Sequence, residues 1–368
     1  MTKAEVFLEN GHVICSIDGI TEFRDTVKHW EDAVVRLLDR DEDEMFRFIG
    51  NACSQLVEHN ARGAEVIQIL KNSWLNAPSS SAKFAKPKPP SWITTVSHDA
   101  TWLTDSVRDS AEFGIALSSL SHHAWLAHRE SGLPAGLESV TYESDYFEGG
   151  KTGVGYGSYA TQAEWRLEKA ARQCREVAGI MKFFGLDTTD TRILDVGSGY
   201  GYFRRACADI GWSTQGVEIS KFACRIASEM FDLDTFSGTL ESFSATCVDG
   251  FDVIVMWDFI EHVEDPNAAL AAARNLLKDG GLLFIRTPNL DAIELEVFGS
   301  SYHSLKREHL NLFSALSLSR FMYNSGLNPV LTHSESHLLS GFMRSEVCSW
   351  ATTLKGSDLI SVGRRSRE

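Results

Sequence analysis

Three glycines interrupt an apolar run in the middle of the chain, in ILDVGSGYGYF over residues 193–203. Glycine suits a tight turn from a strand to a helix because it adopts positive φ angles without strain. The spacing is GxGxG, and Tyr202 stands where the dinucleotide-binding pattern GxGxxG needs its last glycine. The turn alone therefore indicates a ligand only weakly, and its spacing does not fit the dinucleotide pattern.

Two acidic residues accompany this turn. Asp195 precedes the first glycine by two residues, where its carboxylate can orient the loop or contact a ligand ammonium group. Glu218 ends a second β-type run, GVEIS over 216–220, and a carboxylate at such a strand end can accept both hydroxyls of a ribose. With no arginine beside Glu218, the two acids favour a cationic ligand that has a free 2′-hydroxyl.

Two histidines are candidates for proton transfer, which histidine performs near neutral pH. His262 follows the run FDVIVMWDFIE over 251–261, and His309 lies in EHLN over 308–311. Each has a second interpretation, because a histidine at the start of a helix can simply orient a loop or touch the ligand. Both interpretations stay open for both residues.

These residues need a scaffold that brings them together. From about residue 192, the β-type runs RILDV, STQGVEI, FDVIVM and GLLFIRT alternate with stretches of helical length. Such alternation predicts an α/β fold, with a parallel sheet covered by helices on both faces. Ligands bind such sheets at the carboxyl ends of the strands, which is where the glycine turn and the acids lie. A last, antiparallel strand is expected at 358–364.

The N-terminal part has a different character. Asn10-Gly11 between two β-type runs predicts a hairpin, and the apolar spacing from Thr21 to about Ser73 is helical. We predict a hairpin and helical region over 1–76, a Ser/Pro/Lys-rich linker over 77–91, a helical segment over 92–140 and the main domain over 141–368. The N-terminal helices could shape a substrate pocket or mediate a homodimer.

Composition narrows the class of partner. The net charge of -15 offers no general attraction to a phosphate backbone, so nucleic acid is not an expected partner and a small-molecule substrate is favoured. The seven cysteines contain no CxxC pair, which indicates neither a zinc knuckle nor a disulfide framework and favours the reducing cytoplasm. No targeting segment and no apolar run of about 18 residues occurs, so no membrane insertion is expected.

Four ordered segments resemble the class I S-adenosylmethionine-dependent methyltransferases. LDVGSGYG is similar to the first motif of that family, and GVEIS to its ribose-binding strand. FDVIVMWDFIEHV with Asp265-Pro266 resembles the fourth-strand segment of the branch that modifies small molecules, which includes quinone O-methyltransferases and enzymes of sugar and natural-product tailoring. LKDGGLL over 277–283 and TPN over 287–289 resemble the turn before the fifth strand and its end. The resemblance covers roughly residues 142 to 364.

This resemblance implies a Rossmann-like, seven-stranded, mostly parallel sheet and S-adenosyl-L-methionine as the cofactor. It places Gly238-Thr239-Leu240-Glu241 at the edge of the adenine and His309 on the substrate side. His262 and His309 are the predicted catalytic residues, and no metal ligand is predicted. The predicted cofactor-binding residues are Tyr156, Tyr159, Asp195, Gly197, Ser198, Gly199, Tyr200, Gly201, Glu218, Ile219, Thr239, Leu240, Trp257 and Asp258.

Tyrosine and glycine are both abundant just before this region, in YESDYFEGG over 142–150 and GVGYGSY over 153–159. Glycine allows movement and tyrosine offers an apolar body with a polar tip, which suits a lid over the cofactor. In the resembling branch, such tyrosines contact the methionine end of the cofactor. The alternative is a surface loop with aromatic residues anchored in the core.

Other functions compete with methyl transfer to a hydroxyl of a sugar, lipid or secondary metabolite. Tyr302 and Lys306 match the Tyr-x-x-x-Lys of short-chain dehydrogenases, but that family spaces its glycines GxxxGxG. Methylation of nitrogen or carbon would use the same cofactor pocket, and a cofactor-binding scaffold without turnover would have the same motifs. Methylation of amides in nucleic acid or protein is disfavoured, because the Asx-Pro-Pro-aromatic turn is absent.

Overall fold

A computed structural model describes most of the chain from residue 162 onward and several segments before it. The described residues are 4–9, 12–17, 20–26, 87–91, 100–104, 107, 112–118, 121–136, 142, 144–148, 162–292, 294–295, 302, 304–335, 354 and 356–366. The chain divides into two compact units, one of residues 1–82, 291–302 and 334–358, the other of residues 83–290, 303–333 and 359–368. No helix within these described ranges is long and apolar enough to cross a membrane.

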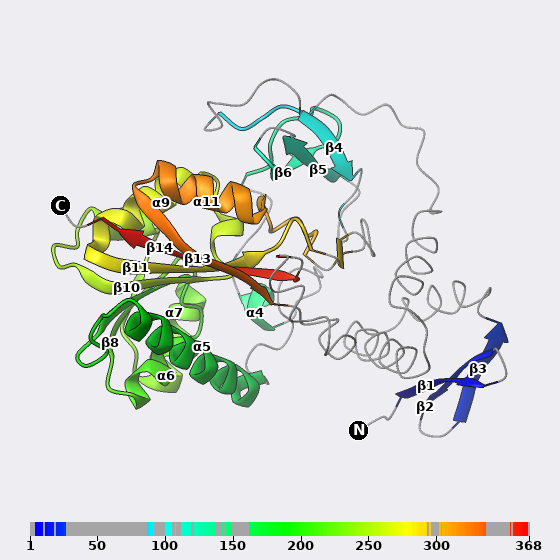
Figure 1. Ribbon diagram of the computed structural model, residues 1–368, viewed down its shortest axis with the longest axis horizontal. Helices are drawn as coiled ribbons and strands as arrows, with labels where there is room; N and C mark the ends of the chain where they lie inside the picture. The colour runs from blue at the N-terminus through cyan, green and yellow to red at the C-terminus, as the bar shows by residue number, and fades with distance from the viewer. Residues whose placement is uncertain are drawn as a thin grey trace. The chain divides into compact units, whose positions relative to one another are not determined.

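A seven-stranded sheet dominates the described part of the chain, in the order β13-β14-β11-β10-β7-β8-β9 (Figure 1). The neighbours β11, β10, β7, β8 and β9 are parallel to one another. The α/β fold class is therefore confirmed, and the predicted last strand is present as β14. The strand bounds are β7 Arg192–Val196, β8 Ser213–Glu218, β9 Thr235–Ser237, β10 Phe251–Trp257, β11 Leu277–Pro288, β13 Leu327–Glu335 and β14 Asp358–Arg365.

Helices cover both faces of this sheet, as Figure 1 shows with α9 and α11 on one side and α5, α6 and α7 on the other. Alternate strand residues point to opposite faces, so Leu194 and Val196 join one hydrophobic cluster while Ile193 and Val253 join the second. The helices are α4 Ser144–Glu148, α5 Ala163–Phe183, α6 Tyr202–Asp209, α7 Lys221–Phe231, α8 Leu240–Ser244, α9 Pro266–Leu276 and α11 Ala315–Asn324, with a short 3-10 turn η4 at Ile260–His262.

Side-chain caps begin α7, α8, α9 and α11, whereas α6 begins at Gly201 without one. Asp265 accepts hydrogen bonds from the first turn of α9, which has Pro266 at its first position. The Ser314 side chain forms a capping box at the start of α11. These caps set where α9 and α11 begin, and they thereby set the length of the loop before each helix.

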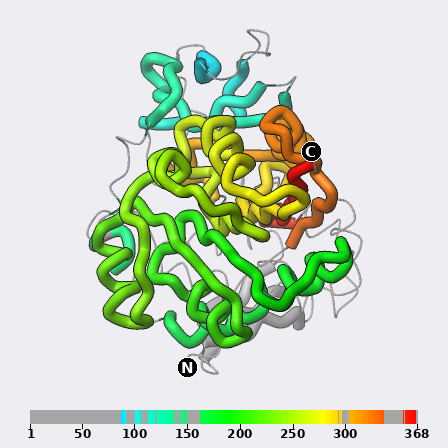
Figure 2. The backbone as a smooth tube through the Cα atoms, turned by 90° about the vertical axis from the view of Figure 1, so that its left-hand side faces the viewer, coloured from blue at the N-terminus to red at the C-terminus, as the bar shows by residue number. Residues whose placement is uncertain are grey.

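Among the described residues of the segment 92–140, the predicted helix is wrong, because these residues are largely β. Strands β4 Ala100–Thr104, β5 Phe113–Ser118 and β6 His123–His128 form an antiparallel sheet, joined at its edge by β12 Asn311–Phe313. Phe113, Ile115 and Leu117 have the two-residue spacing of a strand, which the helical interpretation overlooked. Figure 2 shows β4, β5 and β6 together in cyan and teal, and this sheet belongs to the same unit as β7 to β11.

The N-terminal hairpin is confirmed: β1 Ala4–Glu9 pairs antiparallel with β2 His12–Ile17. A third strand, β3 Ile20–Thr26, pairs with β2, so the helix expected from Thr21 does not begin there. The rest of that helical prediction lies outside the described residues.

Only residues 87–91 of the predicted linker are described, and these pack on the antiparallel sheet. Trp125 Nε1 donates to the Lys88 carbonyl at 3.1 Å, and the Lys88 amide donates to the Gly132 carbonyl at 2.7 Å. Pro87 and Pro90 are buried. These residues have neither helix nor strand, as the prolines predict, and this end of the segment packs against the sheet.

Candidate active site

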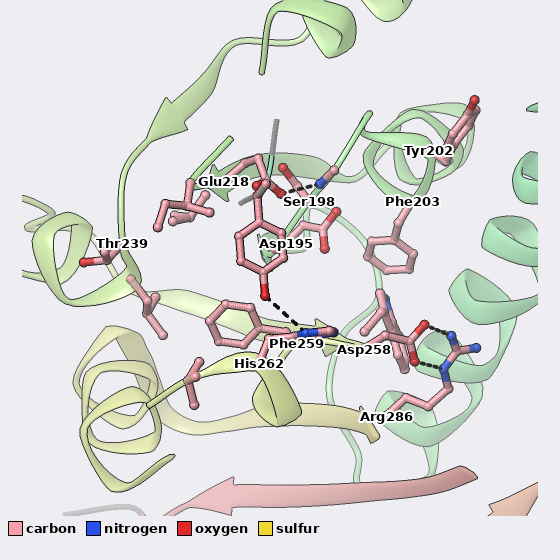
Figure 3. Close-up of a pocket in the computed structure, with 18 of the residues that line it drawn as sticks. Asp195, Ser198, Tyr202, Phe203, Glu218, Thr239, Asp258, Phe259, His262 and Arg286 are labelled. Carbon is pink, nitrogen blue, oxygen red and sulfur yellow. Dashed lines mark hydrogen bonds and ion pairs between the residues drawn. The ribbon is translucent and has the colours of Figure 1, made fainter. Parts of the chain in front are cut away.

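A cavity of about 460 Å³ opens at the carboxyl ends of β7, β8, β10 and β11, a volume within the range that small-molecule sites have (Figure 3). The loops after parallel strands meet at this edge, so residues far apart in sequence surround one space. Of the predicted site residues, those that line the cavity are Asp195, Gly197, Ser198, Gly199, Glu218, Ile219, Thr239, Leu240, Trp257, Asp258 and His262.

All three glycines of the turn between β7 and α6 have positive φ, and at two of them an added Cβ would also meet a neighbouring side chain. Gly197 has φ +72°, and a Cβ there would lie 2.9 Å from the Phe259 ring. Gly201 begins α6 with φ +81°, and a Cβ there would lie 2.5 Å from Leu233 Cδ1. Both positions need glycine for backbone conformation and for space, so these two glycines are required by the turn itself.

Tyr200 and Gly201 were predicted to contact the cofactor, but neither lines the cavity. Tyr200 is 1% exposed, and its ring stacks on Phe147 with centroids 5.2 Å apart. The turn sends Ser198 toward the cavity and Tyr200 into the core below α4. The prediction took the whole motif as ligand contacts, and a cofactor contact of these two residues stays a prediction.

Glu218 ends β8 beside the glycine turn, as predicted. One carboxylate oxygen accepts from the Gly199 amide at 2.9 Å, and the other accepts from the Ser220 amide at 2.9 Å (Figure 3). Burial raises the pKa of Glu218, and these backbone hydrogen bonds oppose that rise. The carboxylate therefore ties the end of β8 to the turn while it faces the cavity.

Asp195 is almost fully buried at the end of β7 and also lines the cavity. Burial raises its pKa to about 7, while Arg204 lowers the pKa and Glu218 raises it. The ionised form of Asp195 is thus disfavoured in the folded protein without a ligand, and a cationic ligand group beside the carboxylate would stabilise it.

Replacing Asp195 by asparagine is expected to stabilise the fold at alkaline pH. The folded-state pKa lies above the unfolded value, so the folded protein holds this proton more tightly and loses stability as pH rises from about 4 to 7. Asparagine removes that loss. We expect the free energy of unfolding of Asp195→Asn to exceed that of the wild type by roughly 2 to 4 kcal/mol at pH 8.

Urea unfolding at pH 5 and pH 8 measures this difference. The wild type should lose stability relative to Asp195→Asn between the two values. An equal gap between the two proteins at both pH values would contradict the raised pKa.

Two buried polar atoms lining the cavity have no hydrogen-bond partner among the described residues. These are Ser198 Oγ in the glycine turn and Trp257 Nε1 at the end of β10. An unpaired buried donor is costly, so each is suited to a ligand with polar groups. Together with the two acids, they fit a nucleoside attached to a charged amino-acid chain.

Asp258 lines the cavity, but its charge is already balanced. It accepts from Arg286 Nε at 2.8 Å and from a second Arg286 nitrogen, and Lys169 Nζ lies 3.9 Å away (Figure 3). Burial alone would raise the pKa of Asp258, but these cations hold it well below its usual range. Sequence reasoning missed Arg286, although a charge inside the run GLLFIRT was a visible signal of a buried pair.

The two histidines are neighbours, with ring centroids 4.9 Å apart. His262, on η4, lines the cavity, and its Nδ1–H donates to the Glu308 carbonyl at 2.8 Å. Burial lowers the pKa of His262 to about 4, so the ring is neutral at pH 7. His309 is buried behind the cavity wall and its Nδ1–H donates to the Ser304 carbonyl at 2.7 Å. The structure thus brings the predicted pair together but exposes only one to the cavity.

Glu261 and the two histidines bring a carboxylate oxygen and two ring nitrogens within 4.8 Å of one another. Glu261 is also held by Thr287, whose hydroxyl donates to it at 3.0 Å. Such a set could hold a divalent cation. That no residue of this site binds a metal ion therefore stays a prediction.

Aromatic residues of the segment before α5 close one side of the cavity. Tyr142, Tyr146 and Phe147 line it, and the Tyr142 hydroxyl lies 3.3 Å from His262 Nδ1. Sequence reasoning placed this segment at the cofactor but did not single out these residues. Tyr156 and Tyr159, which it did single out, lie outside the described residues.

The Tyr-x-x-x-Lys pattern does not take part in this site. The Tyr302 hydroxyl donates to the Ser357 carbonyl, and Lys306 pairs with Glu308 at 3.7 Å. Neither residue lines the cavity. A tyrosine with its proton committed to a backbone carbonyl is poorly placed for hydride chemistry.

Comparison with known proteins agrees with this geometry. Residues 166–332 match a family model described as a methyltransferase domain. The ubiquinone biosynthesis O-methyltransferase of Thiobacillus denitrificans is 32% identical over 120 residues, 30% of this chain and 51% of that protein. The protein of the same name from Caulobacter vibrioides is 31% identical over 144 residues, 37% of this chain and 55% of that protein.

The chain spans about half the length of these curated relatives. Among solved structures, a SAM-dependent methyltransferase from Archaeoglobus fulgidus aligns with a TM-score of 0.43 and 15% identity, over 56% of this chain and 99% of that one.

The fold and the site are similar to those of the class I methyltransferases, whose cofactor is S-adenosylmethionine. Residues 166–332 are the part of the chain that matches a methyltransferase domain.

Proposed function

We propose that the protein transfers the methyl group of S-adenosylmethionine to a hydroxyl oxygen of a small molecule, such as a sugar, a lipid or a secondary metabolite. The carboxylate of Glu218 is the observation that carries this proposal, because it joins the ribose position at the end of β8 to the amides of the glycine turn. The cofactor supplies an electrophilic methyl group, and the protein must align the acceptor with it.

The lining of the cavity supports the cofactor-binding roles that we propose. Glu218 accepts the ribose hydroxyls, while Asp195 faces the ammonium group of the methionine part. Ile219, Thr239 and Leu240 border the adenine, since they follow β8 and β9 along the same edge of the sheet. The unpaired Ser198 Oγ and Trp257 Nε1 bind polar atoms of the cofactor.

The acceptor approaches from the side of Tyr142 and His262. Both residues line the cavity and contact one another, and aromatic rings around them exclude water. His262 is neutral, so it presents a ring nitrogen rather than a positive charge to the acceptor. His262 and His309 with Glu261 form the group of residues that assists loss of the hydroxyl proton.

Nitrogen or carbon acceptors remain the second candidate, because the cofactor pocket is the same for all three. The acid-and-histidine cluster favours oxygen, since a hydroxyl needs help to lose its proton. A cofactor-binding scaffold without turnover is the third candidate. We further propose a cytoplasmic location, which the cysteine pattern supports, and a homodimer through the N-terminal region.

Incubation of the protein with methyl-labelled S-adenosylmethionine and a metabolite pool tests this function. We expect the label to appear in a small molecule whose fragmentation in a mass spectrometer locates it on oxygen. Label on nitrogen or carbon would favour the second candidate. Cofactor binding with no labelled product from any pool would favour the scaffold.

A further inference from the structure

Asn311 connects the antiparallel sheet to the turn that presents His262. It is the first residue of β12 and is 1% exposed. Its Nδ2 donates to the carbonyl of Val263, the residue after His262, at 2.6 Å. Its Oδ1 accepts from Nε2 of His123 on β6 at 3.1 Å, so both ends of the amide are engaged and its orientation is fixed.

The same sheet also holds the second histidine. The amide of Leu126 on β6 donates to the carbonyl of Leu310, the residue after His309, at 3.0 Å. Asn311 then pairs with Trp125 as β12 joins β6. Val263, which follows His262, is therefore hydrogen-bonded to Asn311, and Leu310, which follows His309, is hydrogen-bonded to β6. The two histidines lie 47 positions apart in the sequence.

A third contact completes the link between the histidines. His262 donates from Nδ1 to the carbonyl of Glu308, the residue before His309. Movement of the segment 308–311 relative to η4 would therefore break the hydrogen bond that orients the His262 ring. His123 is fully buried and burial lowers its pKa to about 4, so near neutral pH it is an uncharged donor to Asn311.

We propose that Asn311 and His123 are positioning residues for the His262–His309 pair, and that the sheet β4–β5–β6–β12 is the rigid support of the acceptor side of the site. This proposal rests on the proposed function for the reaction that it serves, but the geometry it describes is independent of the acceptor. Asn311 sets the position of η4 through Val263, and His123 fixes the Asn311 amide. Small displacements of a reacting geometry cost large factors in rate.

Asn311→Leu, which removes both hydrogen bonds without adding charge, tests the proposal. We expect η4 to loosen and water to reach His262, so that its pKa rises from about 4 toward its ordinary value of 6.5. The pH titration of the imidazole nitrogens by NMR, assigned with His262→Gln, measures this. The titratable groups around His262 are unaltered: Asp258, Glu261, Lys306, Glu308, His309 and Tyr142.

Ser314→Ala is the matched control. The Ser314 hydroxyl donates to the His122 carbonyl at 2.9 Å and caps α11, so this variant breaks another hydrogen bond to the turn before β6 and removes that cap, without touching η4. It should lower stability and leave the His262 titration as in the wild type. An unchanged titration in Asn311→Leu, or an equal change in Ser314→Ala, would overturn the proposal.

His123→Gln and His123→Phe keep the test decisive if Asn311→Leu does not fold. Glutamine retains an N–H donor for Asn311, whereas phenylalanine retains only the ring. We expect His123→Gln to keep the wild-type titration of His262 and His123→Phe to raise its pKa. The same behaviour in both variants would contradict a role for this hydrogen bond.

Turnover distinguishes this proposal from the function on which it rests. With an acceptor in hand, Asn311→Leu should lower kcat at least about tenfold while the Kd for S-adenosylmethionine stays within about twofold of the wild type. If the wild type transfers no methyl group, the proposed function fails, and the NMR titration still decides whether Asn311 positions His262.

Discussion

Glu218→Ala is expected to weaken binding of S-adenosylmethionine by about 100-fold, which corresponds to about 2.7 kcal/mol. The substitution removes the proposed acceptor of the ribose hydroxyls and releases the amides of Gly199 and Ser220. A hydrogen bond to a charged group contributes about 1.5 to 3 kcal/mol, so loss of the ribose contact alone approaches this value. Isothermal titration calorimetry of both proteins measures the two values of Kd.

Glu229→Ala is the control for this result. Glu229 is an exposed acid on α7 that pairs with Arg225, so its loss changes the net charge equally without touching the cavity. It should bind the cofactor as the wild type does. Wild-type affinity in Glu218→Ala would refute the assignment of Glu218 to the ribose.

His262→Gln is expected to lower kcat for methyl transfer by about 100-fold while cofactor affinity changes little. Glutamine keeps a polar group at the cavity wall but lacks the imidazole ring, and it disturbs the contact with Tyr142. Steady-state rates with labelled cofactor and the acceptor found by mass spectrometry measure kcat, and calorimetry measures the Kd.

His128→Gln serves as the matched variant, because His128 is a partly exposed histidine on β6 beside Glu112 and away from the cavity. Its kcat should equal that of the wild type. Full activity in His262→Gln would mean that alignment of the acceptor with the cofactor suffices for the reaction. His262 would then not be a catalytic residue.

The sheet that binds the cofactor was predictable because its signals are local. A buried parallel strand is a continuous apolar run, and Asp195, Gly197 and Glu218 stand at fixed places at the ends of such runs. Their positions at one edge then follow from the topology of a parallel sheet. The caps of α9 and α11 are local in the same way.

The sheet β4–β5–β6–β12 was not predictable from such signals. Short apolar segments fit a helix or a strand, and the edge strand β12 comes from a part of the chain far from β6. The pair of Asn311 with His123 depends on the same long-range packing. Sequence reasoning therefore found the residues at the carboxyl edge of the parallel sheet and missed the antiparallel sheet beside them.

Calorimetric titration of the wild-type protein with S-adenosylmethionine, S-adenosylhomocysteine and NAD tests the central claim most directly. The account predicts saturable binding of the first two, each at one molecule per chain, and no binding of NAD. The glycine spacing and the Glu218 carboxylate both support that order. Absence of binding by S-adenosylmethionine and S-adenosylhomocysteine, or preferential binding of NAD, would contradict it.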